Sequence, residues 1–260
     1  MSALVLEAKG LIKRYGGLLV SDSIDLALPP AARHALIGPN GAGKTTLVGL
    51  LSGTIKPDAG TIAVMGSNVT DDGPARRVKR GLVRTFQVSS LFARLSVIEN
   101  IYLAASEQAG ASVDLWRPAG KRRDLLARAE AILERLRLGD DRDRPVGEIA
   151  YGRQRLVEIA IALALEPRIL LLDEPAAGIA ASEVSILLEA IDALPPEIAI
   201  LLIEHDMQIV RRFAAEVTVL VHGRVMMTGS PAAVMASAEV QSVYLGTAGA
   251  ARFGGEPGHA

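Results

Sequence analysis

A glycine-rich stretch near the start of the chain has the residue types and spacing that bind phosphate groups. It matches the pattern G-x-x-x-x-G-K-[ST] in full. It lies between the apolar segment Ala35–Ile37 and the helix-like run Leu47–Leu51, the context that a phosphate-binding loop requires. The residues of this loop predicted to bind the nucleotide are Gly38, Pro39, Asn40, Gly41, Ala42, Gly43, Lys44, Thr45 and Thr46.

The chemistry of this loop follows from its residue types. Glycines let backbone N–H groups turn inward around phosphate oxygens, and the following helix adds its positive N-terminal dipole. Lys44 is placed to reach the β- and γ-phosphates, and Thr45 is placed to bind Mg²⁺. The alternative is a glycine-rich turn that binds nothing, but the strand before it and the helix after it favour a nucleotide site.

A second motif combines a buried strand with two carboxylates. Residues 169–175 read Ile-Leu-Leu-Leu-Asp-Glu-Pro, so the acidic pair follows four apolar residues. Ligands of open α/β sheets bind beyond the carboxyl ends of the strands. We therefore expect Asp173 to face the Mg²⁺ at Thr45, and Glu174 to orient a water molecule against the γ-phosphate. A solvated acidic turn is the alternative interpretation.

Composition narrows the class of protein. The chain has 260 residues, a formal net charge of −1, 3% aromatic residues and no cysteine. Disulfides and thiolate metal sites are therefore excluded, and the charge gives no reason to expect nucleic-acid binding. No apolar run approaches the roughly 18 residues of a membrane span, and Met1–Lys9 lacks the apolar region of a signal peptide. We expect a cytoplasmic protein that reaches a membrane only through a partner.

Strand-like and helix-like segments alternate at both ends of the chain, which predicts an α/β fold with a parallel sheet. A mostly helical block from about residue 88 to 165 interrupts the alternation. The expected strands are 4–8, 23–28, 35–37, 60–66, 169–172 and 198–203, with a hairpin at 217–221 and 225–228. The expected helices are 47–51, 97–105, 124–138 and 182–193, with a surface insertion at 107–120 and a loose tail at 247–260.

Several separate motifs occur together in one order. The motifs are Tyr15, the phosphate loop, Gln87, residues 151–155, Asp173-Glu174-Pro175 and His205. They have the order and spacing of an ABC-type ATPase cassette, which the chain resembles over residues 4–246. The resemblance implies a RecA-like phosphate-loop NTPase core with an inserted helical subdomain. It also implies two cassettes stacked head to tail around two ATP molecules. The implied parts are 1–87 and 165–246 for the ATP-binding core, 88–164 for the helical subdomain and 247–260 for a flexible tail.

The resemblance also implies roles for single residues, with ATP and Mg²⁺ as cofactors. Tyr15 would stack on adenine, Gln87 would touch Mg²⁺ and the attacking water, and His205 would donate a hydrogen bond to the γ-phosphate. Alone, Tyr15 could be a strand-end aromatic residue and His205 a structural residue. The signature stretch that would face the nucleotide of a partner cassette is Ala150, Tyr151, Gly152, Arg153 and Gln154. Ala150 stands where the family usually has serine.

Within the family, four stretches and the ending Tyr-Leu-Gly at 244–246 resemble the larger ATPase subunit of branched-chain amino-acid importers. The stretches are 83–87, 95–100, 174–178 and 203–207. The implied function is ATP hydrolysis for import of branched-chain amino acids or related small polar solutes. The implied partners are a second, different ATPase subunit in a heterodimer, two membrane permeases and, indirectly, a periplasmic binding protein, with no nucleic acid. The implied location is the cytoplasmic face of the inner membrane, through the permeases.

Two other functions stay open on the sequence alone. The lipopolysaccharide-export ATPase shares the Tyr-Leu-Gly ending. A non-transport ABC protein that acts on nucleic acid or ribosomes is less well supported, because the chain lacks a coiled coil, a second cassette and a strongly basic face. Residues 88–95 fit either a groove for a permease helix or ordinary subdomain core. The solute is not identified, because the residues that select it would lie in the binding protein and permeases.

Overall fold

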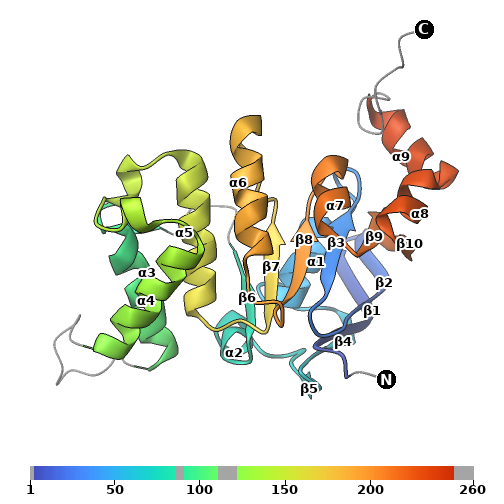
Figure 1. Ribbon diagram of the computed structural model, residues 1–260. Coiled ribbons are helices and arrows are strands. Elements are labelled where there is room, and N and C mark those ends of the chain that lie inside the picture. Colours follow the sequence, from blue (N-terminus) through green and yellow to red (C-terminus); the bar gives the residue numbers. More distant parts are fainter. Residues whose placement is uncertain (1–2, 86–90, 111–121, 249–260) are drawn as a thin grey trace, which may run out of the picture. The chain divides into compact units, whose positions relative to one another are not determined.

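The computed structural model describes residues 3–85, 91–110 and 122–248. The chain divides into two compact units, which we describe one at a time. The first unit combines Met1–Pro74 with Ala199–Ala260, and the second spans Ala75–Ile198. Figure 1 shows the elements of both units along the chain.

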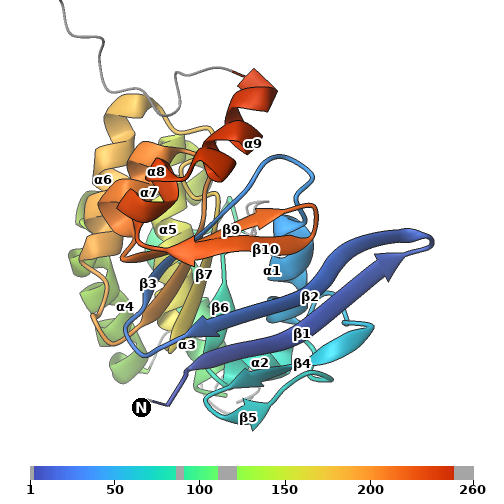
Figure 2. The same ribbon diagram turned by 90° about the vertical axis from the view of Figure 1, so that its right-hand side faces the viewer.

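An antiparallel sheet forms one part of the first unit, with the strand order β2-β1-β4-β5. Its members are β1 (Leu6–Tyr15), β2 (Leu18–Leu28), β4 (Ala59–Val64) and β5 (Ser67–Asn68). β1 and β2 form the long hairpin that is visible in Figure 2. Residues 24–28 alternate strictly between buried and exposed, so one face of β2 packs and the other is solvated. β1 continues to Tyr15 instead of ending at residue 8, and β2 begins at Leu18 instead of at residue 23. β4 ends at Val64, before the predicted end at 66.

Four strands of the six-stranded second sheet belong to this unit, in the order β10-β9-β3-β8. These strands are β3 (Arg33–Ile37), β8 (Ala199–Ile203), β9 (Glu216–Val221) and β10 (Arg224–Gly229). β3 is parallel to β8 and β9, and β9 with β10 forms the predicted hairpin. The helices are α1 (Lys44–Ser52), α7 (Met207–Phe213), α8 (Pro231–Ala236) and α9 (Ala238–Ala248). A core of Ala35, Ile37, Met207, Val210, Val217, Val219, Val234 and Val240 joins the sheet to α7, α8 and α9.

In the second unit, two parallel strands meet a group of helices. The strands are β6 (Leu82–Arg84) and β7 (Ile169–Asp173), and every residue of β7 is buried. The helices are α2 (Pro74–Lys79), α3 (Val97–Gln108), α4 (Arg123–Arg135), α5 (Tyr151–Ala164) and α6 (Ala181–Asp192). Short 3₁₀ turns, η2 (Gly139–Asp141) and η3 (Val146–Glu148), link α4 to α5. Figure 1 shows α3, α4 and α5 packed side by side.

The predicted α/β class is confirmed, but several elements end elsewhere than predicted and others were not predicted. α3 continues to Gln108, two residues into the predicted insertion, and residues 111–121 lie outside the described part. α4 ends at Arg135 rather than at 138, because Arg137 adopts the left-handed conformation with φ 53°. α9 continues to Ala248, so the predicted tail is wrong at its first two residues, and 249–260 are outside the described part. β6, α2, α7, α8 and α9 were not predicted, since each is short or lacks a clear apolar period.

None of the helices in the described ranges is both long and apolar enough to cross a lipid bilayer.

A buried histidine at the start of β3 makes the stability of this protein dependent on pH. His34 is 2% exposed, and its Nε2 lies 2.8 Å from Thr218 Oγ1. Burial lowers the pKa of His34 below its ordinary value of 6.5, and this outweighs the opposing effect of Glu216, whose Oε2 lies 3.2 Å from Nδ1. The folded protein therefore keeps the neutral imidazole.

We expect the free energy of unfolding to fall as the pH drops below about 6.5, because the unfolded chain then binds a proton that folded His34 does not. The slope for this one group is at most about 1.4 kcal/mol per pH unit. Urea unfolding between pH 5 and 7.5 measures it, and His34→Asn should flatten the profile in that range. An equal slope in both proteins would show that His34 does not cause it.

Candidate nucleotide site

The phosphate loop lies between β3 and α1 in the first unit, as predicted. Lys44 is the first residue of α1 and is only 8% exposed. Its Nζ donates hydrogen bonds to the carbonyl oxygens of Gly38, at 2.7 Å, and Pro39, at 3.1 Å. The ammonium group is therefore folded back across the loop, where phosphate oxygens could take the place of these carbonyls. Thr45 is exposed on the first turn of the helix.

Close backbone contacts explain two of the loop glycines. A Cβ at Gly38 would lie 2.2 Å from the carbonyl oxygen of Leu220. A Cβ at Gly43 would lie 2.7 Å from the carbonyl oxygen of Val20, and Gly43 adopts φ 102°, which L side chains rarely adopt. Side chains at these positions would push the loop away from the strands that hold it.

The turn of the β9–β10 hairpin supports the phosphate loop from outside. Gly223 donates its N–H to the carbonyl oxygen of Ala42 at 2.9 Å, and its own carbonyl accepts the N–H of Asp22 at 2.8 Å. Arg224 adds an ion pair with the Asp22 carboxylate. The sequence indicated a hairpin here but carried no signal that its turn contacts the loop.

Two further predicted residues belong to the same unit. In the parallel pair of β3 and β8, Leu36 is aligned with Ile203. The phosphate loop and His205 therefore both follow the carboxyl end of this pair. The His205 side chain is 51% exposed, and its backbone N–H donates to the buried carboxylate of Glu204 at 3.2 Å. Tyr15 ends β1, is 49% exposed and has the ammonium group of Lys13 5.6 Å from its ring centroid.

The acidic pair lies in the second unit. Asp173 is the last residue of β7 and is 5% exposed. Glu174 follows it with φ 48°, a left-handed conformation that is uncommon for residues other than glycine. Glu166 of the same unit adopts a similar conformation, at φ 54°, so this backbone alone does not single out Glu174.

Sequence reasoning missed a partner of Asp173. Arg84, on β6, donates from Nη2 to Asp173 Oδ2 at 2.7 Å, and the two side chains are 14% and 2% exposed. The contact arises because Arg84 is aligned with Leu171, and Asp173 lies two residues farther along the same face of β7. Only the pairing of two strands that are distant in sequence could have indicated it. Gln87, for which a role at Mg²⁺ and the attacking water was predicted, lies outside the described residues.

The signature stretch forms the start of α5 in the second unit. Ala150 is the N-cap residue and provides no side-chain hydrogen bond to the helix. The ring of Tyr151 packs over Gly178, where an added Cβ would lie 3.2 Å from Cε1, and Arg155 stacks on the ring at 4.9 Å from its centroid. The start of α5 is therefore joined to the segment that follows the Asp173-Glu174 pair.

The residues described here fit a nucleotide with Mg²⁺. No group of three or more His, Asp or Glu side chains that could enclose a metal occurs among the described residues. Mg²⁺ bound with nucleotide phosphates needs only one or two protein groups, however, and Thr45 and Asp173 are of the right chemical type. The phosphate loop, Tyr15 and His205 belong to one unit, and Asp173, Glu174 and the signature belong to the other.

Comparison with known proteins decides the family. The model of the ABC transporter family matches residues 21–177. The chain belongs to the ABC transporter ATP-binding family. It is 39% identical over 256 residues to the high-affinity branched-chain amino acid transport ATP-binding protein LivG of Escherichia coli (strain K12), covering 95% of this chain and all of LivG. BraF of Pseudomonas aeruginosa, with the same description, is 36% identical over 255 residues, 95% of this chain and all of BraF.

Solved structures agree with this assignment. The ABC transporter cassette MJ1267, in its ADP conformation, matches with a TM-score of 0.84 and 27% identity over 94% of this chain and all of that one. CbiO1 from Clostridium perfringens, part of an ABC transporter complex, matches with a TM-score of 0.78 and 26% identity over 93% of this chain and 95% of that one. The predicted ABC ATPase cassette is confirmed, and the chain is an ATP-binding and ATP-hydrolysing subunit of this family.

Proposed function

We propose that this chain is an ATPase subunit of an importer for branched-chain amino acids or related small polar solutes. The observation that carries the proposal is the 39% identity to LivG across 95% of the chain. Relatives at 35–39% identity are ATP-binding subunits for branched-chain amino acid transport and for ribose import, which favours the importer over the lipopolysaccharide-export ATPase that shares the Tyr-Leu-Gly ending. This also disfavours a protein acting on nucleic acid or ribosomes.

In the proposed chemistry, each predicted residue has one task. Lys44 neutralises the β- and γ-phosphates, and Thr45 and Asp173 hold Mg²⁺ together with the phosphate oxygens. Glu174 orients the attacking water. Gln87 contacts Mg²⁺ and this water, and His205 donates a hydrogen bond to the γ-phosphate. Tyr15 stacks on adenine, for which its exposed ring is suited. Bound Mg²⁺ would supply positive charge to the transferred phosphoryl group.

We also propose that the cassette binds permease subunits at the cytoplasmic face of the membrane. Near residues 88–95, an apolar pocket of about 90 Å³ is lined by Val83, Leu91, Ile161, Ala162 and Leu165, among others. Phe92 beside Leu91 is 60% exposed, which is unusual for so large an apolar side chain. The pocket is also lined by Arg84, Thr85 and Glu158. Its mainly apolar lining and an exposed aromatic residue next to Leu91 in the sequence suit a helix-in-groove contact. Residues 88–90 lie outside the described part.

The proposed function is tested by assembly. The isolated chain should be a poor ATPase, because each complete site needs the signature helix of a second cassette. The measurement is the ATPase rate against protein concentration, alone and reconstituted with the permeases and binding protein of its transporter. Leucine and a polar control solute are each added to the reconstituted complex. Stimulation by the amino acid supports the importer, whereas high activity that is independent of concentration would contradict the two-cassette site.

Ala150 predicts an asymmetric pair of sites. Alanine cannot give the hydroxyl hydrogen bond that serine would give to the partner's γ-phosphate. A hydrogen bond to a charged group contributes about 1.5–3 kcal/mol, so its loss weakens that site roughly 10- to 150-fold. In a heterodimer with an intact partner signature, the site with this chain's own phosphate loop and Glu174 is the stronger one.

We therefore expect mutation of Glu174 to reduce transport more than mutation of the equivalent glutamate in the partner subunit. The two glutamates are changed to glutamine separately in the assembled transporter, and ATPase and uptake rates are compared. Ala150→Ser serves as the matched variant and should raise the rate or leave it unchanged. Equal losses, or a larger loss from the partner's mutation, would refute the asymmetry.

A further inference from the structure

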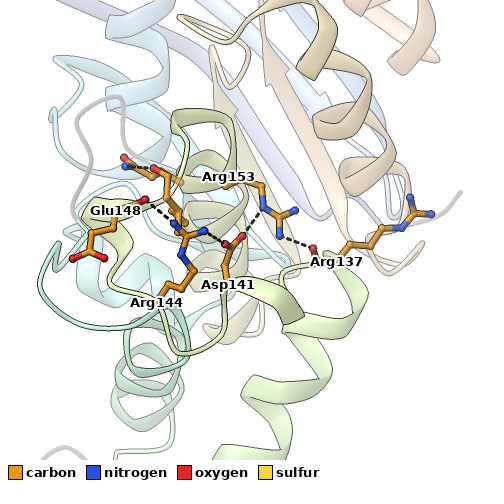
Figure 3. A network of polar contacts seen from close by, with 7 residues as sticks. Arg137, Asp141, Arg144, Glu148 and Arg153 are labelled. Carbon is orange, nitrogen blue, oxygen red and sulfur yellow. Dashed lines mark hydrogen bonds and ion pairs between the residues drawn. The ribbon is translucent and has the colours of Figure 1, made fainter.

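Asp141 is a buried carboxylate at the centre of a polar network in the second unit (Figure 3). Its side chain is 8% exposed and accepts hydrogen bonds from two arginines. Arg144 donates from Nη1 to Oδ1 at 2.9 Å, and Arg153 donates from Nε to Oδ2 at 2.7 Å. Both carboxylate oxygens are therefore engaged by charged donors, which satisfies the buried charge.

The same two arginines reach beyond Asp141 to the backbone. Arg153 Nη2 donates to the carbonyl oxygen of Arg137 at 2.8 Å, just past the end of α4. Arg144 Nη2 donates to the carbonyl oxygen of Glu148 at 3.0 Å, at the end of η3. Figure 3 shows these contacts beside the two that the same arginines make to Asp141. Through the two arginines, the Asp141 carboxylate thus joins three places: the first turn of α5, the end of α4, and Glu148. Glu148 directly precedes residues 149–152, which we call the signature loop and which overlap the signature stretch.

The segment between these attachment points is the signature loop, residues 149–152. Its N-cap residue, Ala150, makes no side-chain hydrogen bond to the helix, so no ordinary cap fixes the entry to α5. Gln154 Nε2 donates to the carbonyl oxygen of Ile149 at 3.1 Å, within the same chain. Tyr151 packs over Gly178 within the loop, and the contacts at the two ends of the loop add to this; both of those lead to Asp141.

We propose that Asp141 is a positioning residue for ATP hydrolysis. Through Arg144 and Arg153 it fixes the backbone N–H groups of residues 149–152 for the nucleotide of a partner cassette. Arg153 then acts inside its own chain, on Asp141 and Arg137, and not on that nucleotide. This inference rests on the proposed two-cassette site, which supplies the nucleotide that the loop faces.

A double-mutant cycle tests the proposal in the assembled transporter, with Asp141→Asn, Arg153→Gln and the double variant. The matched controls are Asp140→Asn, at the exposed neighbouring carboxylate, and Arg142→Gln, whose guanidinium pairs with Glu130 and Asp143 rather than Asp141. Thermal unfolding confirms that each variant is folded, and Asp141→Glu replaces Asp141→Asn if that variant is not. Hydrogen exchange at residues 149–154 and the kcat and KM for ATP are measured for each.

We expect faster exchange in residues 149–154 for each single variant. In a Glu174→Gln background, where only the site that faces this loop turns over, we expect kcat lower by about 10- to 100-fold, as for a displaced catalytic group. KM for ATP should change little, because the nucleotide that this loop faces is held mainly by the partner cassette's own phosphate loop. The double variant should lose no more than the worse single variant, since both remove the same connection. The two controls should match the parent protein in exchange and in kcat.

Three results would overturn the proposal. Losses in kcat that multiply in the double variant would show that Arg153 acts independently of Asp141. A rise in kcat for Arg153→Gln would show that glutamine at this position contacts the partner's nucleotide better than arginine does. Unchanged exchange in Asp141→Asn would show that Asp141 does not position the loop. Faster exchange with an unchanged kcat would instead count against the two-cassette site, and with it against any role of the loop in hydrolysis.

Discussion

Lys44→Ala is expected to abolish ATP hydrolysis and to weaken nucleotide binding severely. The Lys44 ammonium is held at the phosphate loop by hydrogen bonds of 2.7 and 3.1 Å to two loop carbonyls. Phosphate oxygens in their place would form charge-assisted hydrogen bonds worth about 1.5–3 kcal/mol each. Losing two of them corresponds to roughly 10²- to 10⁴-fold weaker binding.

Binding is measured by titration with a fluorescent ATP analogue, and hydrolysis by phosphate release in the reconstituted complex. Lys56→Ala is the matched control, because Lys56 is an exposed lysine of the same unit that pairs only with the exposed Asp71. This control should behave as the parent protein does. If Lys44→Ala still bound and hydrolysed ATP, the phosphate loop would not be part of the nucleotide site.

Glu174→Gln is expected to separate binding from hydrolysis. The amide keeps the size of the side chain but cannot orient and activate a water molecule as the carboxylate can. ATP binding should stay within about twofold of the parent protein, while kcat falls by roughly 10²-fold or more. The variant should therefore accumulate bound ATP in the assembled complex, which filter binding of labelled ATP measures.

The chain offers a matched control for this change. Glu166, in the same unit, is also a glutamate with a left-handed backbone, at φ 54°. Its carboxylate pairs with Arg128 and has no predicted role at the nucleotide. Glu166→Gln reproduces both the chemical change and the backbone setting, so its kcat should equal that of the parent protein. A parental rate in Glu174→Gln would reject Glu174 as the catalytic carboxylate.

Local motifs made much of this protein predictable. The phosphate loop and the Asp173-Glu174 pair each lie within a few consecutive residues, beside a strand whose apolar run is itself a local signal. The hairpin of β9 and β10 was predictable for the same reason, because two apolar runs flank a short turn. The roles of Tyr15, Gln87 and His205 came from family spacing and stay predictions.

What the tertiary structure alone decided are contacts between residues far apart in the chain. Arg84 meets Asp173 because β6 pairs in parallel with β7, and Gly223 meets Ala42 because a hairpin near the C-terminus returns to the phosphate loop. Hydrophobic periodicity specifies which face of an element is buried, but not which distant element covers it. The link from Asp141 to Arg153 has the same origin, since packing brings the end of α4 to the start of α5 and places a buried carboxylate between two arginines.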